Sequence, residues 1–358
     1  MNGIFSKFTS PSDHLGIDIG TTSIKIAEVG LEKGVVTLKN YALFETLGHL
    51  ERSNTALQTS TLKLFEDEIA SYLRLIIRRA GFNAREAIVS IPAFQAFTTI
   101  LDLPQMSQED ADRTIRFKAE QYIPLPINSV ALDWVKVGEK LMDGIKTDQY
   151  FLISYPNEVI EHYKKIFNLV GLSLFSLELE GVSLARLLGS DQKPALIIDL
   201  GSRSTSLLAV KDGSLRLMSQ TDYAGSSLTV SLASGLGINV RRAEDLKRQK
   251  GLSGLDNPAD RELSTQMLPI LSVILGEAKR LRERFESAYS LPIGQIILTG
   301  NGANLIGLEK YIGRELGLEV HRANPWQSIA LREDLSPLSS ELGASLSVAL
   351  GLTAKYFK

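Results

Sequence analysis

Asp18-Ile19-Gly20-Thr21-Thr22-Ser23 is a stretch that the chain nearly repeats 181 positions later (199 − 18), as Asp199-Leu200-Gly201-Ser202-Arg203-Ser204. Each copy follows an apolar run and leads into a β-branched one, which predicts a strand, a tight turn and a second strand. The backbone N–H groups and hydroxyls of such a turn can bind an anion, while the Asp can hold a cation or a water beside it. Two copies therefore predict two half-sites that close on one polyphosphate.

The composition predicts a soluble globular protein with two lobes. At 358 residues the chain exceeds the usual size for one hydrophobic core. Its net charge of −2 argues against a general nucleic-acid-binding protein. The absence of cysteine excludes disulfides, thiolate zinc sites and cysteine nucleophiles. No apolar run reaches the roughly 18–20 residues that span a bilayer, and no signal peptide is recognised, so we expect a cytoplasmic protein.

The hydrophobic pattern predicts three segments along the chain. The first has strands at 15–19, 24–29, 35–39 and 86–91, a loop over 45–60 and a helix from 65 to 81. The second is an inserted αβ unit with a helix over 107–122, strands at 130–137 and 150–154, and a helix over 157–170. A helix over 174–189 then leads to the second lobe, with a strand at 295–299 and helices at 227–233, 241–250, 268–285 and 342–353.

The residue types of the two turns suit a nucleotide and a metal ion. Gly20 and Gly201 let the backbone approach a phosphate without a Cβ in the way. Asp18 and Asp199 fit Mg²⁺, which keeps several waters and rarely takes an all-protein cage. One copy alone would be weak support, because such turns occur in many folds. Hydroxyl donors that add no charge are Thr21, Thr22, Ser23, Ser202 and Ser204.

Three further features could complete this site, and each has a plainer interpretation. Lys25 could reach a phosphate as a point charge, or face solvent from its strand. Glu244 and Lys247 could bracket a ribose or an adenine edge, or form an exposed ion pair on one helix face. The turn after strand 295–299 could let a base approach the backbone, or be an ordinary loop; it contains Gly300, Asn301, Gly302, Ala303 and Asn304.

Together these motifs resemble three motifs of the actin-like ATPase superfamily. Residues 18–25 resemble its phosphate 1 motif, residues 199–205 its phosphate 2 motif and residues 298–304 its adenosine motif. Within it, residues 14–355 look most like the type IV pilus assembly family PilM, which is related to the division protein FtsA. The most specific stretches are Leu103-Pro104-Gln105-Met106-Ser107, Glu120-Gln121-Tyr122-Ile123-Pro124-Leu125-Pro126 and Ala243-Glu244-Asp245-Leu246-Lys247.

The resemblance implies an α/β, two-lobed actin-like fold made of duplicated ribonuclease-H-like domains, with an inserted αβ subdomain. ATP or ADP with Mg²⁺ would lie between the lobes, at the residues named above and Arg203. Ala224-Gly225-Ser226-Ser227 stands where the family usually has a Gly-Gly pair, and Arg203 adds charge to the second turn, so we expect binding with weak or absent hydrolysis. The implied subdomains are 1A (1–93 and 174–190), 1C (94–173), 2A (191–240 and 291–358) and 2B (241–290).

The resemblance also implies partners. The N-terminal cytoplasmic peptide of a PilN-like inner-membrane protein would dock in a groove between 1A and 1C, to be sought first along residues 88–91 and 108–122. The chain would then be a scaffold that links pilus motor ATPases to the inner-membrane platform and reaches the membrane through partners. Self-association is compatible with this role.

Two other functions remain open at this stage. A small-molecule kinase of the same superfamily would need a general-base carboxylate, and no Asp with a matching context is found. An FtsA-like filament former would carry a C-terminal amphipathic membrane helix, which residues 353–358 do not resemble. A platform protein of the type II secretion system is close kin that the sequence separates poorly.

Overall fold

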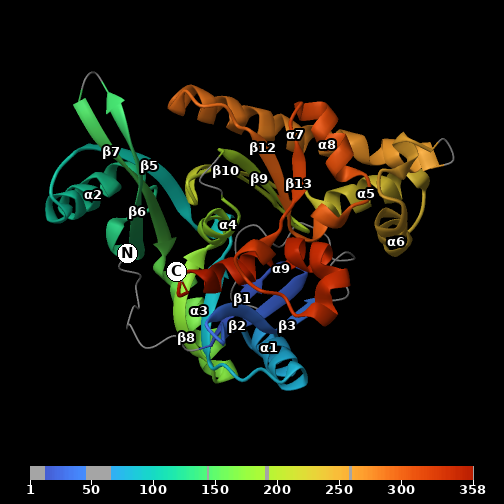
Figure 1. The fold of residues 1–358 in the computed structure, drawn as a ribbon, viewed down its shortest axis with the longest axis horizontal. Coiled ribbons are helices and arrows are strands. Elements are labelled where there is room, and N and C mark those ends of the chain that lie inside the picture. The colour runs from blue at the N-terminus through green and yellow to red at the C-terminus, as the bar shows by residue number, and fades with distance from the viewer. Residues whose placement is uncertain (1–12, 46–65, 143–144, 190–192, 258–259, 358) are drawn as a thin grey trace.

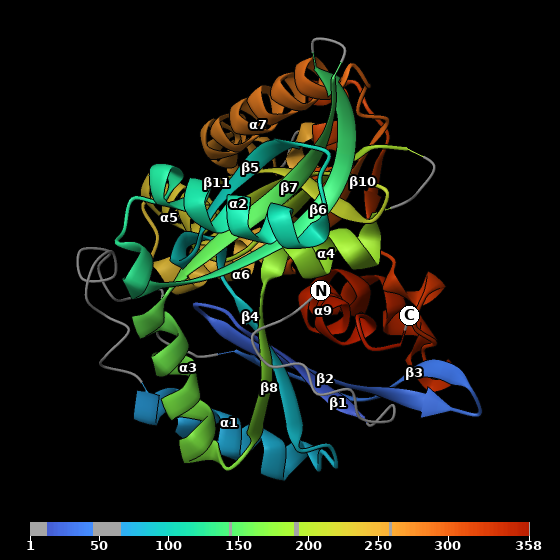
Figure 2. The same ribbon diagram turned by 90° about the vertical axis from the view of Figure 1, so that its left-hand side faces the viewer.

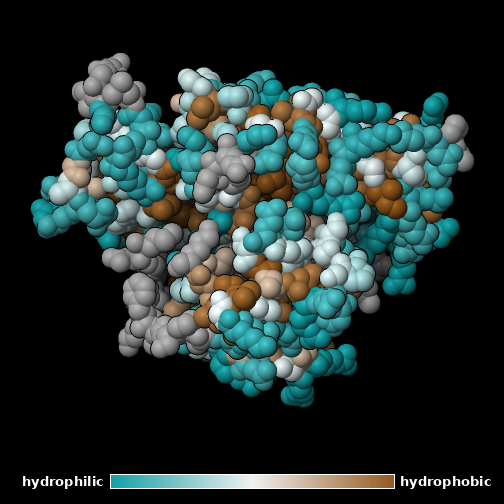
Figure 3. Space-filling view, viewed as in Figure 1, coloured by the Kyte–Doolittle hydropathy of each residue, from teal (hydrophilic) through white to brown (hydrophobic). Residues whose placement is uncertain are grey.

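The computed structural model describes residues 13–45, 66–142, 145–189, 193–257 and 260–357. These residues form two lobes, one above the other in Figure 1, with an additional unit to one side. Figure 3 shows polar residues over most of this face and hydrophobic ones near its middle, where the upper and lower parts meet. Most of the loop expected over 45–60 lies outside the described residues.

The first lobe is built on a five-stranded sheet of order β3-β2-β1-β4-β8. β1 pairs antiparallel with β2 and parallel with β4. Helices α1 (Glu66–Ala80) and α3 (Asn157–Val170) lie on one side of this sheet in Figure 2, and α9 (Ser339–Ala354) lies on the other. The strands are β1 (His14–Ile19), β2 (Ser23–Glu32), β3 (Val35–Glu45), β4 (Glu86–Ile91) and β8 (Ser173–Leu179).

The second lobe repeats this topology, with the sheet order β11-β10-β9-β12-β13. The repeat extends to the hairpins, because Lys33-Gly34 and Asp212-Gly213 both have positive φ, which two-residue hairpin turns of this kind require. The strands are β9 (Ala195–Leu200), β10 (Thr205–Lys211), β11 (Ser214–Thr221), β12 (Gln295–Thr299) and β13 (Val320–Arg322). The helices are α5 (Gly225–Leu236), α6 (Val240–Lys250), α7 (Arg261–Tyr289) and α8 (Leu308–Leu316).

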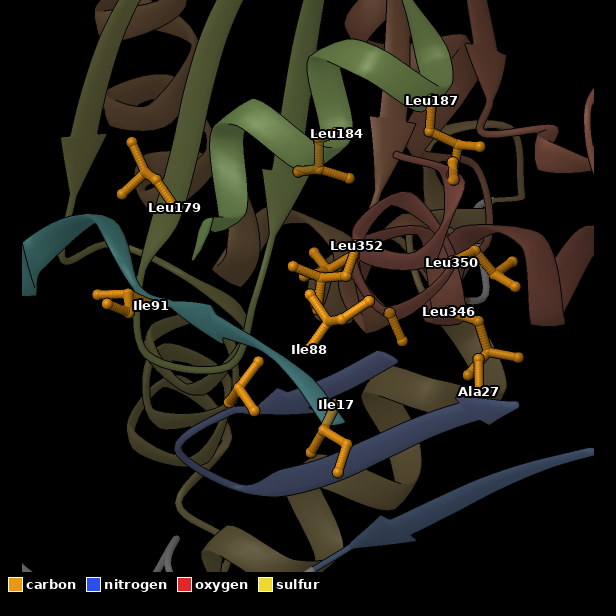
Figure 4. Packing of buried hydrophobic residues seen from close by; sticks show 14 of the residues in the cluster. Ile17, Ala27, Ile88, Ile91, Leu179, Leu184, Leu187, Leu346, Leu350 and Leu352 are labelled. Atoms are coloured by element: carbon orange, nitrogen blue, oxygen red, sulfur yellow. The ribbon is translucent and has the colours of Figure 1, made fainter. Parts of the chain in front are cut away.

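Two helices between the lobes hold the molecule together. α9 is buried from Leu342 to Ala354, and in Figure 4 its Leu352 lies beside Ile88 of β4 and its Leu346 beside Ala27 of β2. A Cβ on Gly16 would lie 1.9 Å from the carbonyl oxygen of Ala349, so the glycine allows α9 to rest directly on β1. α4 (Glu180–Leu188) packs on α9 from the other side. One hydrophobic core therefore includes residues of both lobes.

The inserted unit contains a three-stranded sheet of order β5-β7-β6 with α2 on one face. Helix α3, which was expected within this unit, packs instead against α1 and β8 of the first lobe. The backbone N–H of Asp110 donates to Ser107 Oγ at 3.2 Å, which confirms the predicted cap of α2. Strand β5 is not predicted from the sequence. The elements of this sheet and its helix are β5 (Phe97–Pro104), α2 (Gln108–Tyr122), β6 (Val130–Met142) and β7 (Ile145–Pro156).

The helix predicted over 174–189 is wrong in its first half. Residues 173–179 form β8, which pairs in parallel with β4, and only Glu180–Leu188 is helical. The apolar residues of this stretch suit either structure at short length, and pairing with β4 decides between them. The correction places Glu180 at the first residue of a helix, beyond the end of a strand, instead of in a helix interior.

Candidate functional site

The two predicted turns have the same backbone geometry. The N–H of Gly20 donates to the carbonyl of Ser23 at 2.9 Å, and the N–H of Gly201 donates to the carbonyl of Ser204 at 3.1 Å. In the flanking hairpins Asp18 pairs with Lys25, and Asp199 pairs with Ser206. Each lobe therefore presents one Asp and one hydroxyl-bearing turn at the same place in its sheet. Of the remaining turn residues, Thr21 is exposed and Thr22, Ser202 and Arg203 are half-buried.

Asp18 and Lys25 form a buried pair at the first turn. Lys25 Nζ donates to Asp18 Oδ2 at 3.1 Å, and Ser90 Oγ donates to Asp18 Oδ1 at 2.9 Å. Burial works against the charge of Lys25, but Asp18, Asp199 and Glu180 together raise its pKa. Lys25 thus stays charged and faces carboxylates of both lobes, which contradicts the plainer interpretation of a solvent-facing strand lysine.

Asp199 and Glu180 bring further negative charge to this point. Burial raises the pKa of Asp199 to about 6, with Lys25 opposing and Asp18 adding to the shift. Burial and the charges of Asp199 and Asp18 raise the pKa of Glu180 to about 8. Ser206 Oγ donates to Glu180 Oε1 at 2.8 Å, and the backbone N–H of Ala93 donates to it at 3.3 Å. The carboxyl group is therefore held between elements of both lobes.

Glu180 is not among the site residues predicted from the sequence, and no other carboxylate was predicted to act as a base. Glu180 lies within Leu177-Glu178-Leu179-Glu180-Gly181, a stretch for which the sequence pattern predicts a helix interior. A usable signal is Glu180 itself, since acidic residues are enriched in the first turn of a helix. The structure therefore adds a titratable group that the sequence analysis lacked.

The second turn rests on the first turn of helix α5. The N–H groups of Gly225 and Ser226 donate to the carbonyls of Gly201 and Ser202, at 3.0 and 2.7 Å. Lys247 Nζ, on α6, donates to the carbonyl of Gly225 at 2.9 Å. Residues 201–202, α5 and α6 are thus joined by hydrogen bonds into one assembly.

Glu244 and Lys247 form a buried pair, not the exposed one that was the plainer interpretation. Lys247 Nζ lies 2.7 Å from Glu244 Oε2, and the two side chains are 12% and 15% exposed. Burial alone would raise the pKa of Glu244, but Lys247, Thr229 and Arg248 lower it to about 2. Arg248 also contacts Glu45 at the end of β3, with two nitrogen–oxygen distances of 3.2 Å, so this network reaches the first lobe.

The glycine turn after β12 packs against the second turn, residues 199–204. A Cβ on Gly300, where φ is +81°, would lie 2.5 Å from Asp199 Oδ1. A Cβ on Gly302 would lie 2.4 Å from Leu200 Cγ, so both glycines are needed for this approach. Ala303 is fully buried, and Asn304 has a buried Oδ1 that makes no hydrogen bond with the described residues. An unpaired buried acceptor of this kind costs free energy unless a ligand or water pairs with it.

These residues fit a nucleotide and a hydrated divalent cation. The turns supply backbone N–H groups and neutral hydroxyls, and Asp18 and Asp199 supply an acceptor-only carboxylate from each lobe. Among the described residues, no three His, Cys, Asp or Glu side chains come together as a metal cage. Two carboxylates and a shell of waters are the arrangement that Mg²⁺ prefers.

Comparison with known proteins identifies the family. A family model described as type IV pilus assembly protein PilM matches residues 16–357. The chain belongs to the PilM family of type IV pilus assembly proteins. The cell division protein FtsA of Enterococcus faecalis is 21% identical over an alignment of 354 positions, which covers 87% of this chain and 77% of FtsA. The family relation predicted from the motifs is therefore confirmed.

Solved structures confirm the actin-like fold. A structure titled PilM-PilN type IV pilus biogenesis complex has a TM-score of 0.80 and 22% identity, and the match covers 98% of this chain and 100% of that one. MreB 5 of Spiroplasma citri bound to AMPPNP has a TM-score of 0.53 and 13% identity, with 96% and 95% covered. None of the helices in the described part of the chain is both long and apolar enough to cross a membrane.

Proposed function

We propose that this chain is a nucleotide-binding scaffold of the type IV pilus assembly platform. The observation that carries the proposal is the pair of matching turns, whose Asp18 and Asp199 both act on Lys25 from different lobes. ATP or ADP would bind with its phosphates between the turns and its adenosine near Gly300, Gly302 and Glu244. MreB 5, which shares the fold, was solved with AMPPNP.

Mg²⁺ would be held by Asp18 and Asp199 through water, and would offset the negative charge of the phosphates. Glu180 is the candidate group for accepting a proton from an attacking water. With a pKa of about 8 it is mostly protonated at neutral pH, so it is a poor base in the unliganded protein. This supports the expectation of slow hydrolysis, and it gives no support to a fast small-molecule kinase.

The proposed partner is the N-terminal cytoplasmic peptide of a PilN-like inner-membrane protein. The solved structure titled PilM-PilN type IV pilus biogenesis complex contains a PilM together with PilN. This chain shares the fold of that PilM over nearly the whole length of both chains. The site would lie at the junction of the first lobe and the inserted unit, and the partner would bring the chain to the inner membrane. Contacts with pilus motor ATPases and self-association are further parts of this proposal.

The experiment is a fluorescence-anisotropy titration with that synthetic peptide, with and without ATP and Mg²⁺. We expect saturable micromolar binding whose affinity changes when the nucleotide is present. The variant Gly20→Arg, which puts a long side chain into the first turn, should lose the nucleotide effect but keep peptide binding. Val35→Arg adds the same charge at an exposed site in the β2–β3 hairpin and is the matched control. Absence of peptide binding in a chain that still binds ATP would contradict the scaffold role.

A further inference from the structure

Arg216 is a buried cation that lies outside the proposed nucleotide site. It is on β11, its side chain is 7% exposed, and its Nη2 lies 3.5 Å from Asp212 Oδ2, on a side chain that is 47% exposed. The Nε of Arg216 is buried and makes no hydrogen bond with any residue that the structure describes. A buried charge is unfavourable unless it is closely paired and its N–H groups are hydrogen-bonded, so the burial of Arg216 is only partly compensated.

The guanidinium of Arg216 contacts the inserted unit and the end of α7. A Cβ on Gly138 of β6 would lie 2.2 Å from Arg216 Nη1, so this glycine leaves the room that the guanidinium fills. Gly138 pairs with Gln149 of β7. Arg216 Cζ lies 5.9 Å from the centre of the Tyr289 ring, and the Tyr289 hydroxyl is hydrogen-bonded to the side chain of Gln149. We call Gly138, Gln149, Arg216 and Tyr289 the polar joint.

Gln149 brings a second unpaired group to the polar joint. Its Nε2 donates to Asp102 Oδ1 at 2.9 Å, but its Oε1 is buried and accepts no hydrogen bond from the described part of the chain. An unpaired donor, Arg216 Nε, and an unpaired acceptor, Gln149 Oε1, therefore belong to the same contact. Each of these groups loses hydrogen bonds to water when the contact closes and makes them again when it opens. The polar joint is thus less stable than its buried area alone indicates.

The other contact between the inserted unit and the second lobe is apolar and lies nearer the first lobe. Phe151 and Ile153, further along β7 than Gln149, belong to the core that also contains Leu208 and Leu215 of the second lobe. The chain joins the inserted unit to the first lobe alone, through β4 and α3. In Figure 2 the strands of the unit run up from that connection towards α7. The apolar contact is therefore the inner one, and the polar joint holds the outer end of the sheet.

We propose that the polar joint opens and recloses while the apolar contact stays closed, so that the inserted unit pivots on the second lobe. This inference goes beyond the proposed function and does not depend on it. Local opening occurs where the net stabilisation is smallest, which in this interface is the end with the unpaired groups. Because β11 pairs with β10, which follows the second turn, the pivot changes the position of the inserted unit relative to the strands that carry this turn.

The test measures the distance between the inserted unit and the second lobe. The chain has no cysteine, so Glu109→Cys on α2 and Lys279→Cys on α7, both at exposed positions, can each carry one nitroxide spin label. Double electron–electron resonance should show two distances for this pair, one for the closed and one for the open joint. Labels at Lys279→Cys and Lys310→Cys, both in the second lobe, should show one distance and are the control.

Two variants of the labelled chain should change the ratio of open to closed forms in opposite directions. Gly138→Ala places a Cβ where Arg216 Nη1 lies and displaces the flexible end of that side chain, so we expect the ratio to rise about tenfold. Arg216→Met removes the buried charge and keeps a long apolar side chain, so we expect the ratio to fall about tenfold. The matched controls are Gly276→Ala, whose Cβ would lie an ordinary 3.9 Å from Arg280 Nη1, and Arg241→Met at an exposed site.

Opposite changes in the two variants, with both controls at the wild-type ratio, would support the pivot. A single narrow distance in the wild type that neither variant changes would overturn the inference, and would mean that a buried water pairs with Arg216 Nε and Gln149 Oε1. A rise of the open form in both variants would also overturn it, because Arg216 would then stabilise the closed contact.

Discussion

At Glu180, burial and the charges of Asp199 and Asp18 raise the pKa to about 8, against 4.5 for an unperturbed glutamate. The folded protein therefore keeps a proton that the unfolded chain releases between these two values. The protonated Glu180 makes its full contribution to stability below pH 4.5, and this contribution is lost as the pH rises through 8. This group makes the molecule less stable in mild alkali, at the point where the two lobes meet.

Glu180→Gln tests this directly, because the amide can still accept from Ser206 and never ionises. We expect the variant to be more stable than the wild type by about 1–3 kcal/mol at pH 8.5, and nearly equal to it at pH 4.5. Urea denaturation at the two pH values measures the difference. Glu341→Gln, at an exposed position of α9, is the control. A difference that is the same at both pH values would show that ionisation of Glu180 has no part in it.

Gly300 is a second residue on which the site depends. Gly300 has a φ of +81° and Gly34 a φ of +80°. A Cβ added at Gly300 would clash with Asp199, whereas a Cβ added at Gly34 would lie in open space. We expect Gly34→Ala to cost about 1 kcal/mol for backbone strain alone, and Gly300→Ala about 2–4 kcal/mol. Equal losses of stability in thermal unfolding would mean that the contact with Asp199 is unimportant.

At the scale of elements, the second turn is held in place by α5 and α6 through Lys247. Lys247→Met leaves Glu244 buried without its main partner, so we expect a loss of about 2–4 kcal/mol in the free energy of unfolding. The double variant Glu244→Gln, Lys247→Met removes both charges and should recover part of that loss. If the double variant loses as much unfolding free energy as the two single variants together, the two side chains do not stabilise each other.

Turns and caps that depend on neighbouring residues could be predicted from the sequence, whereas elements that depend on pairing with distant segments could not. The turns at 18–23 and 199–204 were predicted because glycine, hydroxyl and Asp side chains act within a few residues. The cap of α2 at Ser107 was predicted for the same reason. β8 was not, since its strand form depends on pairing with β4, more than eighty positions earlier in the chain. The cluster of Glu180 with Lys25 and Asp199 was missed with it, because only the fold brings these side chains together.

At the scale of the molecule, the lobes are joined by a shared core. The core on which α4 and α9 pack contains Ile17 and Ile88 of the first lobe together with Ile197 and Leu208 of the second. A ligand that binds between the lobes should therefore stabilise both at once. At a hundredfold excess over its dissociation constant, ATP with Mg²⁺ should add about 2.7 kcal/mol. Hydrogen exchange should slow to a similar degree in β1 and β9, whereas slowing in one lobe alone would contradict a shared site.

The central claim is that the two turns form one nucleotide site, and nucleotide titration of charge-reversed turns tests it most directly. Thr21→Glu and Ser204→Glu each place a carboxylate in one turn, where it repels phosphates, and Val35→Glu adds the same charge at an exposed site away from both. Calorimetric titration with ATP and Mg²⁺ should give wild-type affinity for Val35→Glu and a loss of about a hundredfold for each turn variant. Wild-type affinity in either folded turn variant would contradict the account, because a site made by one turn alone needs no duplication.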